Sequence, residues 1–370
     1  MNSEVDMAFR ILSAGLVLAM TASMALADGL IPDRRMTLSR NVDFYGSDLT
    51  NIFDTSFDAC TRACLTDPQC KAFTFNTKSS ACFPKSDITQ SQPFEGALSV
   101  RVTDAAPAEL RLAEAQRTQA AFLTDRDLSA AYSQANSMTS RYAANTFSLQ
   151  QFIDAAQKSR NEGKPDVAMR FIGAGLTIED RSDLWDQFAR DAASAANKDA
   201  NKRREFNRLY LTASVNAYLR APNPATSVNA LTLLADAFER NGRGRDAIAP
   251  LRLAQSLQPR DDTEKALDRV IGLFGFNVAD TDVENNSAEP RICVAFSEPL
   301  SKTTDYAPFV QSQIEGLSIE AQDRQLCLGG LNHGERYRFS LRQGLPAASG
   351  EVLQKPIEIT QYVRDRAPSV

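Results

Sequence analysis

Residues 60–85 read CTRACLTDPQCKAFTFNTKSSACFPK and hold four of the six cysteines in this 370-residue chain. Cys60 and Cys64 are about one helical turn apart, so both thiols lie on one face of a predicted helix. Residues 71–76 alternate small or aromatic side chains with polar ones, which predicts a half-buried strand, and Cys82 begins a second strand. A helix fixed to a β-hairpin by two disulfides is the simplest geometry for this spacing, although four cysteines allow three pairings.

The segment around these cysteines resembles the PAN/apple module. The likeness runs from about Arg35 to Thr103 and includes RNVDFYGSDL at 40–49, AFTFN at 72–76, CFPK at 82–85 and FEGALS at 94–99. The resemblance implies that Cys60 pairs with Cys82 and Cys64 with Cys70. It also implies a module, at residues 28–104, that binds proteins or carbohydrates and has no catalytic residues.

The first 27 residues have the pattern of a secretory signal peptide. Arg10 provides a positive charge, residues 11–20 form a short apolar core, and Ala25-Leu26-Ala27 is a small-x-small cleavage site before Asp28. The alternative is a membrane anchor, but a bilayer-spanning helix needs about 20 apolar residues and this run is shorter. We therefore expect an exported protein, periplasmic or extracellular, in which disulfides persist and reduced buried thiols are the less favoured alternative.

Length and charge limit the remaining possibilities. The mature chain is long enough for two or three domains. Acidic residues outnumber basic ones by five, which argues against a nucleic-acid-binding protein because such proteins need a basic face. No segment after the signal is apolar enough to cross a membrane, so we expect no membrane span after signal cleavage.

A linker, residues 104–108, is predicted to join the first module to a helical domain at 105–275. In its clearest unit, residues 229–261, an apolar stripe is followed by a break at Asn241-Gly242-Arg243-Gly244 and a second stripe. This unit resembles a tetratricopeptide repeat, and residues 152–175 and 184–219 follow the same plan. Such a stack predicts either a concave surface for a partner or a spacer, with Trp185, the only tryptophan, in the core.

The last part of the chain has the pattern of a β-sandwich. Short strands are predicted at 290–296, 325–328, 334–341 and 357–363, between turns rich in Gly, Pro, Asn and Asp. Cys293 and Cys327 are expected to tie two of these strands by a disulfide, with a free thiol pair as the alternative. Residues 275–287 are rich in carboxylate and amide side chains and are predicted to form an exposed connector between independently folding units.

Four stretches of this C-terminal part, 291–300, 305–308, 325–346 and 362–370, resemble the first macroglobulin-type domain of bacterial alpha-2-macroglobulins. In that family a PAN/apple module and a helical region precede this domain, which is assigned to residues 276–370. The resemblance implies a multidomain protein: a small α+β module, an all-α tetratricopeptide-like repeat and a C-terminal β-sandwich. It also implies the recognition and scaffold part of a protease inhibitor, with proteases or further macroglobulin domains as partners.

This chain departs from the family in lacking a bait region and the Cys-Xaa-Glu-Gln thioester motif, and it ends where a further domain would begin. An independent adhesion or protein- or carbohydrate-binding scaffold is the alternative function. Catalysis is not expected. The single histidine, His333, lies in a predicted turn, no motif supplies triad partners, and cysteines held in disulfides cannot bind a metal. We therefore predict no catalytic, cofactor or metal residues, and no cofactor.

Overall fold

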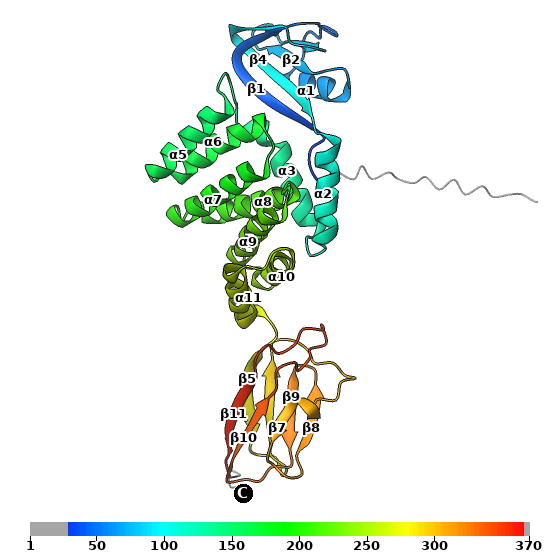
Figure 1. Cartoon of the computed structure of the whole chain (residues 1–370), viewed down its shortest axis with the longest axis vertical. Helices are drawn as coiled ribbons and strands as arrows, with labels where there is room; N and C mark the ends of the chain where they lie inside the picture. Colours follow the sequence, from blue (N-terminus) through cyan, green and yellow to red (C-terminus); the bar gives the residue numbers. More distant parts are fainter. Residues whose placement is uncertain (1–28, 366–370) are drawn as a thin grey trace, which may run out of the picture.

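The computed structural model describes residues 29–365, which form an elongated molecule with a small α/β module, a helical region and a β-rich unit in chain order (Figure 1). The predicted signal peptide at residues 1–27 lies outside the described part. Below, residues 29–104 are called the N-terminal module, residues 105–275 the helical region and residues 276–365 the C-terminal unit.

The N-terminal module is one antiparallel sheet with a helix packed on it. Its sheet has the strand order β1-β4-β2-β3. The helix begins after Ser56, whose side chain accepts a hydrogen bond from the backbone N–H of Ala59 and so caps the first turn. The elements are β1 (Arg34–Tyr45), α1 (Phe57–Thr66), β2 (Ala72–Asn76), β3 (Ala81–Lys85) and β4 (Gln90–Asp104).

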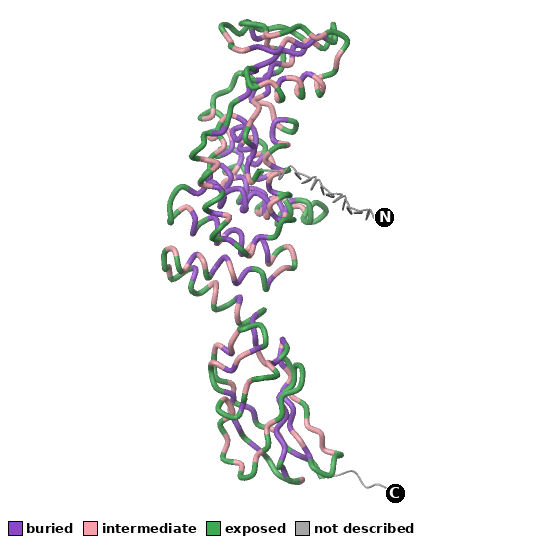
Figure 2. The backbone as a smooth tube through the Cα atoms, turned by 90° about the vertical axis from the view of Figure 1, so that its right-hand side faces the viewer, coloured by how far each residue is buried: buried purple, intermediate pink, exposed green. Residues whose placement is uncertain are grey.

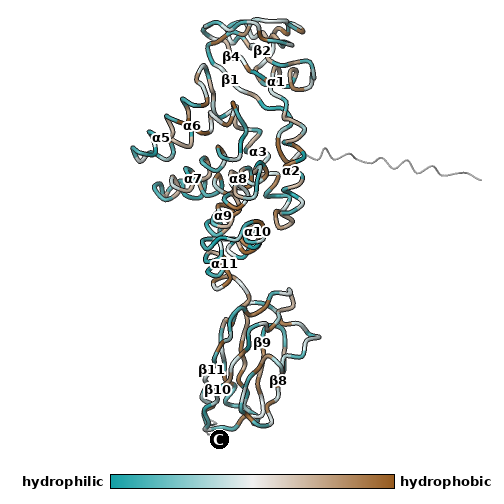
Figure 3. Tube along the Cα trace, viewed as in Figure 1, coloured by the Kyte–Doolittle hydropathy of each residue, from teal (hydrophilic) through white to brown (hydrophobic). Residues whose placement is uncertain are grey.

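The helical region consists of ten α-helices and one 3-10 helix in the described chain. Along each helix tube hydrophobic and hydrophilic residues alternate, the pattern of amphipathic helices (Figure 3). The first five are α2 (Pro107–Gln119), α3 (Asp125–Asn136), α4 (Met138–Arg141), α5 (Leu149–Asn161) and α6 (Pro165–Ile178). The others are α7 (Ser182–Lys198), α8 (Arg203–Leu219), α9 (Pro224–Arg240), η1 (Gly244–Ala247), α10 (Ile248–Leu257) and α11 (Asp261–Phe274).

Short turns join successive helices of this region into hairpins. Helix α5 packs against α6, α7 against α8, and α9 against α10. The break predicted at residues 241–244 is present, and Gly242 there adopts a positive φ of 73°, which glycine accepts without strain. Buried residues concentrate in the middle of the region, whereas α11 is largely exposed (Figure 2). Trp185 is 1% exposed, so the prediction that it belongs to the core is confirmed.

The C-terminal unit contains two antiparallel sheets, with strand orders β5-β6-β9-β8 and β11-β10-β7. Buried residues from both sheets, including Val294, Leu328 and Phe339, belong to one hydrophobic cluster. The elements are β5 (Val278–Glu284), β6 (Arg291–Phe296), η2 (Ala307–Phe309), β7 (Val310–Ser312), β8 (Ser318–Gln322), β9 (Gln325–Gly329), β10 (Glu335–Leu341) and β11 (Ile357–Val363).

The prediction of an exposed connector at residues 275–287 was wrong. Most of this segment is β5, which pairs with β6 from Val278 to Glu284 as the edge strand of its sheet. Its acidic side chains are accommodated because an edge strand has polar surroundings on its outer side, while Val278 and Val283 pack against the core. The chain therefore passes from α11 to β5 through only residues 275–277.

The predicted linker at residues 104–108 is also not a linker in the structure. Asp104 is the last residue of β4, and Pro107 is the first residue of α2. Between them Ala105 is 9% exposed, and its N–H donates to the backbone carbonyl of Asp33. The composition of this segment predicted a linker, but its proline is at the first position of a helix, where its missing N–H costs nothing.

Candidate functional site

Three disulfides are present in the described chain, and together they involve all six cysteines. In the N-terminal module they join Cys60 to Cys82 and Cys64 to Cys70, the pairs that the family resemblance implies. In the C-terminal unit, Cys293 of β6 and Cys327 of β9 face each other in register and are bonded. All six residues are buried, so these bonds are structural supports and not exposed reactive groups.

The N-terminal module is held rigid on both sides of its helix. Below α1, Cys60 and Cys64 are fully buried against the sheet with Phe73 and Val100. At the end of α1, the guanidinium of Arg34 donates to the backbone carbonyls of Cys64 (3.0 Å), Leu65 (2.7 Å), Asp67 (3.0 Å) and Cys70 (2.5 Å). Two of these carbonyls, those of Cys64 and Leu65, lie in the last turn of α1, where a helix leaves carbonyls without helical partners.

Asp104 completes this arrangement from the end of β4. Its carboxylate accepts hydrogen bonds from Lys71 and from Arg34, the latter at 3.1 Å. The hydrogen bond from Lys71 is the main reason that the pKa of Asp104 lies below its usual value, and the charge of Arg34 adds to the effect. The module therefore offers a stable frame for any surface group that it carries.

An aromatic pair, one ring exposed and the other partly buried, lies at the β3 edge of this frame. Phe53 is 65% exposed and meets Phe83 of β3 edge-to-face, with ring centroids 6.4 Å apart. Loop 47–55 runs along the outer edge of β3, where Ile52 exchanges two backbone hydrogen bonds with Cys82. Asp54, immediately after Phe53, has a positive φ of 51°, a local conformation that few residues other than glycine adopt.

A charged pair borders the aromatic pair. The Lys85 ammonium lies 5.8 Å from the Phe83 ring centroid and forms an ion pair with Asp48. Lys85 is 5% exposed, whereas the Asp48 side chain is 43% exposed and remains available to solvent. We call Asp48, Phe53, Phe83 and Lys85 the aromatic edge. It combines an exposed apolar ring with a fixed charge pair, which is typical of a binding surface.

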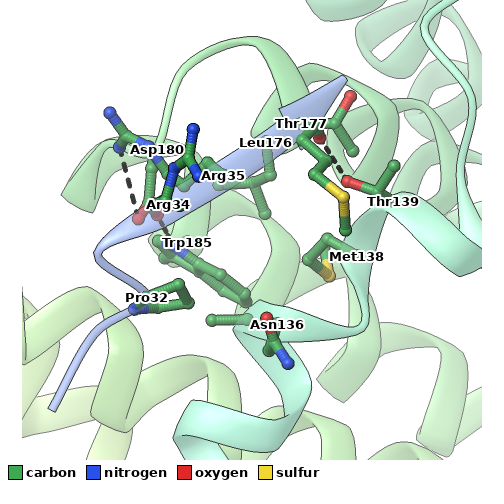
Figure 4. Close-up of a pocket in the computed structure, with 12 residues that line it drawn as sticks. Pro32, Arg34, Arg35, Asn136, Met138, Thr139, Leu176, Thr177, Asp180 and Trp185 are labelled. Atoms are coloured by element: carbon green, nitrogen blue, oxygen red, sulfur yellow. Dashed lines mark hydrogen bonds and ion pairs between the residues drawn. The ribbon is translucent and has the colours of Figure 1, made fainter. Parts of the chain in front are cut away.

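The junction between the N-terminal module and the helical region is the second feature that the fold assembles (Figure 4). The free edge of β1 is covered by the helical region. Ala144 and Asn145 donate backbone hydrogen bonds to Leu38, and the side chain of Thr37 donates to the carbonyl of Thr177. This cover protects an edge strand that would otherwise be open to another chain.

Asp180 is the centre of the charged part of the junction. Its carboxylate accepts a 2.6 Å hydrogen bond from Trp185 Nε1 and lies 3.4 Å from the Arg35 guanidinium of β1. Arg220 Nε lies 2.6 Å from the same carboxylate as an ion pair without well-directed hydrogen-bond geometry. The hollow beside Trp185 measures only about 20 Å³, enough for one water molecule. It is therefore a small gap in the packing between the two parts of the chain and not a ligand site.

His333 lies in the turn before β10, as the sequence predicts, and its Nε2 is 2.9 Å from the backbone oxygen of Asn285. Within residues 29–365 no group of three or more His, Cys, Asp or Glu residues is arranged to hold a metal ion. In the same range, no helix is long and apolar enough to span a membrane. Sequence reasoning missed the aromatic edge, and a short apolar Ile52-Phe53 beside turn residues was the only available signal.

Comparisons with known proteins identify one part of the chain. Residues 35–104 match the family model described as a PAN domain. No curated protein matches the chain significantly. One similar solved structure is the N-terminal part of the bacterial S-layer protein SbsC, with 14% identity and a TM-score of 0.21 over 64% of this chain and 57% of that one. The chain thus spans little more than half of that structure, and the likeness is too low to carry an argument. Residues 35–104, which contain the disulfide-bonded helix α1 and the aromatic edge, are a PAN domain.

Proposed function

We propose that this protein is an exported, non-catalytic binding protein whose PAN domain holds a protein or carbohydrate ligand at the aromatic edge. The observation that carries the proposal is Phe53, a phenyl ring 65% exposed on a module fixed by two disulfides. Three of the seven large hydrophobic side chains exposed in the described chain, Tyr45, Phe53 and Phe94, belong to this module. Exposed aromatics on a rigid frame lose little conformational freedom when they bind.

The charge pair beside the ring supports a directional contact. Asp48 is held by Lys85 yet half exposed, so it can accept hydrogen bonds from a backbone N–H or from a sugar hydroxyl. Phe53 would supply apolar contact area for a hydrophobic side chain or for the face of a sugar ring. Both ligand classes known for PAN modules thus meet complementary groups at this edge.

The same proposal assigns the rest of the chain to a scaffold. We infer that the helical region is a tetratricopeptide-like stack and the C-terminal unit a macroglobulin-type β-sandwich. The supporting observations are the helix hairpins α5–α6, α7–α8 and α9–α10, and the two antiparallel sheets that share one core. With the sequence resemblance, these features favour the recognition and scaffold part of an alpha-2-macroglobulin-type protease inhibitor.

Two further points belong to the proposal. The disulfides and the PAN domain fit an exported protein, in the periplasm or outside the cell. The proposal assigns no catalytic role to His333, because its Nε2 lies at hydrogen-bond distance from a backbone oxygen of the β5–β6 turn. An independent adhesion scaffold is the alternative, and it shares the binding surface but predicts a different ligand class.

Binding measurements with a matched pair of variants test the proposal. Phe53→Ser removes the exposed ring of the aromatic edge. Phe147→Ser is the control, because Phe147 is also exposed (53%) and also meets a second ring, Phe152, edge-to-face, but lies in the helical region. The probes are immobilised trypsin and elastase, together with an array of defined glycans that includes chitin oligosaccharides.

The proposed inhibitor role predicts that wild type and Phe147→Ser bind at least one protease, and that Phe53→Ser binds it about tenfold or more weakly. Binding to glycans alone, with the same dependence on Phe53, would favour the adhesion scaffold. If both variants bind equally well, or neither probe class binds the wild type, the aromatic edge is not the ligand site.

A further inference from the structure

A second surface, in the helical region, has a chemistry unlike that of the PAN domain. Two adjoining hollows lie where α3, the start of α8 and the turn after α9 meet. Their volumes are about 590 Å³ and 700 Å³, and both are lined by Arg204 and Asn241, so they form one continuous groove. Figure 1 shows α8 and α9 between the PAN domain and the C-terminal unit. We call this the arginine groove.

The groove is strongly basic in a chain with a net charge of −5. One aspartate, Asp127, is the single acidic residue among its described lining residues. Six arginines line it, namely Arg126, Arg203, Arg204, Arg208, Arg240 and Arg243. Because like charges repel, such a cluster costs stability unless something compensates it, and only part of the compensation comes from the chain itself.

Some of these arginines already form ion pairs with acidic residues of the chain. Arg243 forms ion pairs with buried Asp127 and with Asp246, and Arg240 forms one with Asp236. By contrast, the guanidinium groups of Arg126, Arg204 and Arg208 form no hydrogen bond or ion pair with the other residues described by the structure. All three are exposed on the groove wall. These three cations are therefore available to a ligand.

The groove also contains a polar atom that lacks a partner. Asn207 Nδ2 donates to the backbone carbonyl of Arg240 at 3.2 Å, whereas its Oδ1 is buried and has no hydrogen-bond partner within residues 29–365. Because this oxygen is buried, it is not a contact for a ligand in the groove, and the exposed guanidinium groups are what a ligand can reach. Asn207 lines the groove beside Arg204.

The combination selects one ligand class. Guanidinium groups bind carboxylates through paired, charge-assisted hydrogen bonds. An acidic polypeptide provides several carboxylates along one extended strand. Sugar rings and nucleic-acid bases usually stack on aromatic side chains, and no aromatic residue is among the described residues that line the groove.

We propose that the arginine groove binds an acidic segment of a partner protein. Carboxylates of the segment pair with Arg126, Arg204 and Arg208. This surface is separate from the aromatic edge, so the protein has two binding surfaces on one scaffold. The inference does not depend on the function proposed for the PAN domain.

Fluorescence anisotropy with a labelled poly-glutamate peptide tests the inference. A poly-glutamine peptide of the same length is the neutral probe, and a heparin oligosaccharide is the anionic glycan probe. The groove variant is Arg204→Ala with Arg208→Ala. The matched control is Arg111→Ala with Arg141→Ala, two exposed arginines outside the groove for which the structure gives no hydrogen bond or ion pair. Thermal melting of both variants checks that they remain folded.

The expected result is binding of poly-glutamate, weakened by added salt, and at least about a tenfold loss of affinity in the groove variant but not in the control. Equal binding of poly-glutamine, an equal loss in both variants, or no binding of poly-glutamate even at low salt would overturn the inference. Tight heparin binding that depends on Arg204 and Arg208, without peptide binding, would assign the groove to an anionic glycan and overturn it as well.

Discussion

Arg35 in the first strand of the PAN domain and Asp180 in the helical region lie 3.4 Å apart, guanidinium nitrogen to carboxylate oxygen. They are 145 positions apart in sequence. The Asp180 side chain is 6% exposed and also holds Trp185 and Arg220, whose side chain is 5% exposed. One carboxylate therefore links a PAN strand to the core of the helical region, and the two parts should move as one body.

Asp180→Asn should destabilise the protein strongly. The change leaves the buried guanidinium of Arg220 without a counter-charge, a loss that costs about 3–5 kcal/mol in comparable buried pairs. Urea unfolding monitored by Trp185 fluorescence measures the effect. Asp183→Asn is the control because Asp183 pairs with Arg181 at the surface, where an ion pair contributes about 1 kcal/mol or less. Equal losses for both variants would show that Asp180 has no special part in the junction.

Elements that depend on local spacing could be predicted from the sequence, whereas the ion pairs of the junction could not. The helix α1 and its cysteines follow from local spacing, because Cys60 and Cys64 must share a helix face. The strands of β2 and β3 follow from alternation over a few residues. Asp180 carries no such local signal, since its partners come from β1, α7 and the turn after α8. Ion pairs between residues far apart in the chain leave no local pattern, so they could not be predicted from one sequence.

The strand β5 was missed for a different reason. Asp280, Asp282 and Glu284 resemble a solvated loop in composition, yet these positions pair in register with β6. An edge strand needs only one apolar side to pack, so Val278 and Val283 are sufficient. Likewise the arginine groove draws residues from three separate segments, and only the folded chain shows that Arg126 lies beside Arg204.

Limited proteolysis can distinguish the observed β5 from the connector expected from composition. A cut in the β5–β6 turn, residues 285–290, should give two fragments on a denaturing gel that still elute together from a gel-filtration column. The reason is that β5 remains hydrogen-bonded to β6 and packed on the C-terminal core. Separation of the fragments under native conditions would contradict the pairing.

The disulfides of the PAN domain should be recovered as Cys60–Cys82 and Cys64–Cys70 in peptides mapped without reduction. Replacing Cys60 and Cys82 by serine should lower the free energy of unfolding of this small module by about 2–5 kcal/mol. The measurement is denaturant unfolding of the variant against the oxidised wild type. A bond between Cys60 and Cys64, or four thiols open to alkylation in the folded protein, would rule out the assignment.

The ionisation of Asp127 should make the free energy of unfolding depend on pH in the acidic range. Burial alone would raise its pKa, but hydrogen bonds from Arg243 and Thr124 outweigh burial and hold the pKa below the ordinary value of 3.8. A carboxyl with a lowered pKa in the folded state contributes its full stability above the unfolded pKa and loses it as the pH falls through the folded pKa. Asp127→Asn should therefore cost roughly 1.5–3 kcal/mol at neutral pH. This cost should shrink below about pH 4, near the unfolded value.

Urea unfolding of wild type and variant between neutral pH and acid measures this difference. Asp246→Asn is the matched control, because Asp246 pairs with the same Arg243 but its side chain is 49% exposed. The control should lose about 1 kcal/mol or less at neutral pH. A cost for Asp127→Asn that stays constant down to strongly acidic pH would show that its ionisation does not stabilise the fold.

The orientation of the C-terminal unit should depend on two ion pairs that connect it to the helical region. Arg252 of α10 binds Glu351 through two hydrogen bonds of 2.7 and 2.8 Å, and Arg245 of η1 pairs with Glu298, which is 6% exposed. Residues 275–277 are the covalent connection, with Phe276 stacked on Phe296 at 5.1 Å. Two ion pairs and one short chain segment therefore hold the C-terminal unit against the helical region.

The double variant Arg245→Ala with Arg252→Ala removes both ion pairs and leaves the covalent connection. Because a single segment permits rotation, small-angle X-ray scattering should show a broader distribution of shapes for this variant than for the wild type. Arg269→Ala, which breaks an ion pair with Glu239 inside the helical region, is the control and should leave the scattering unchanged. Identical scattering of the double variant and the wild type would mean that packing around Phe276 alone fixes the orientation.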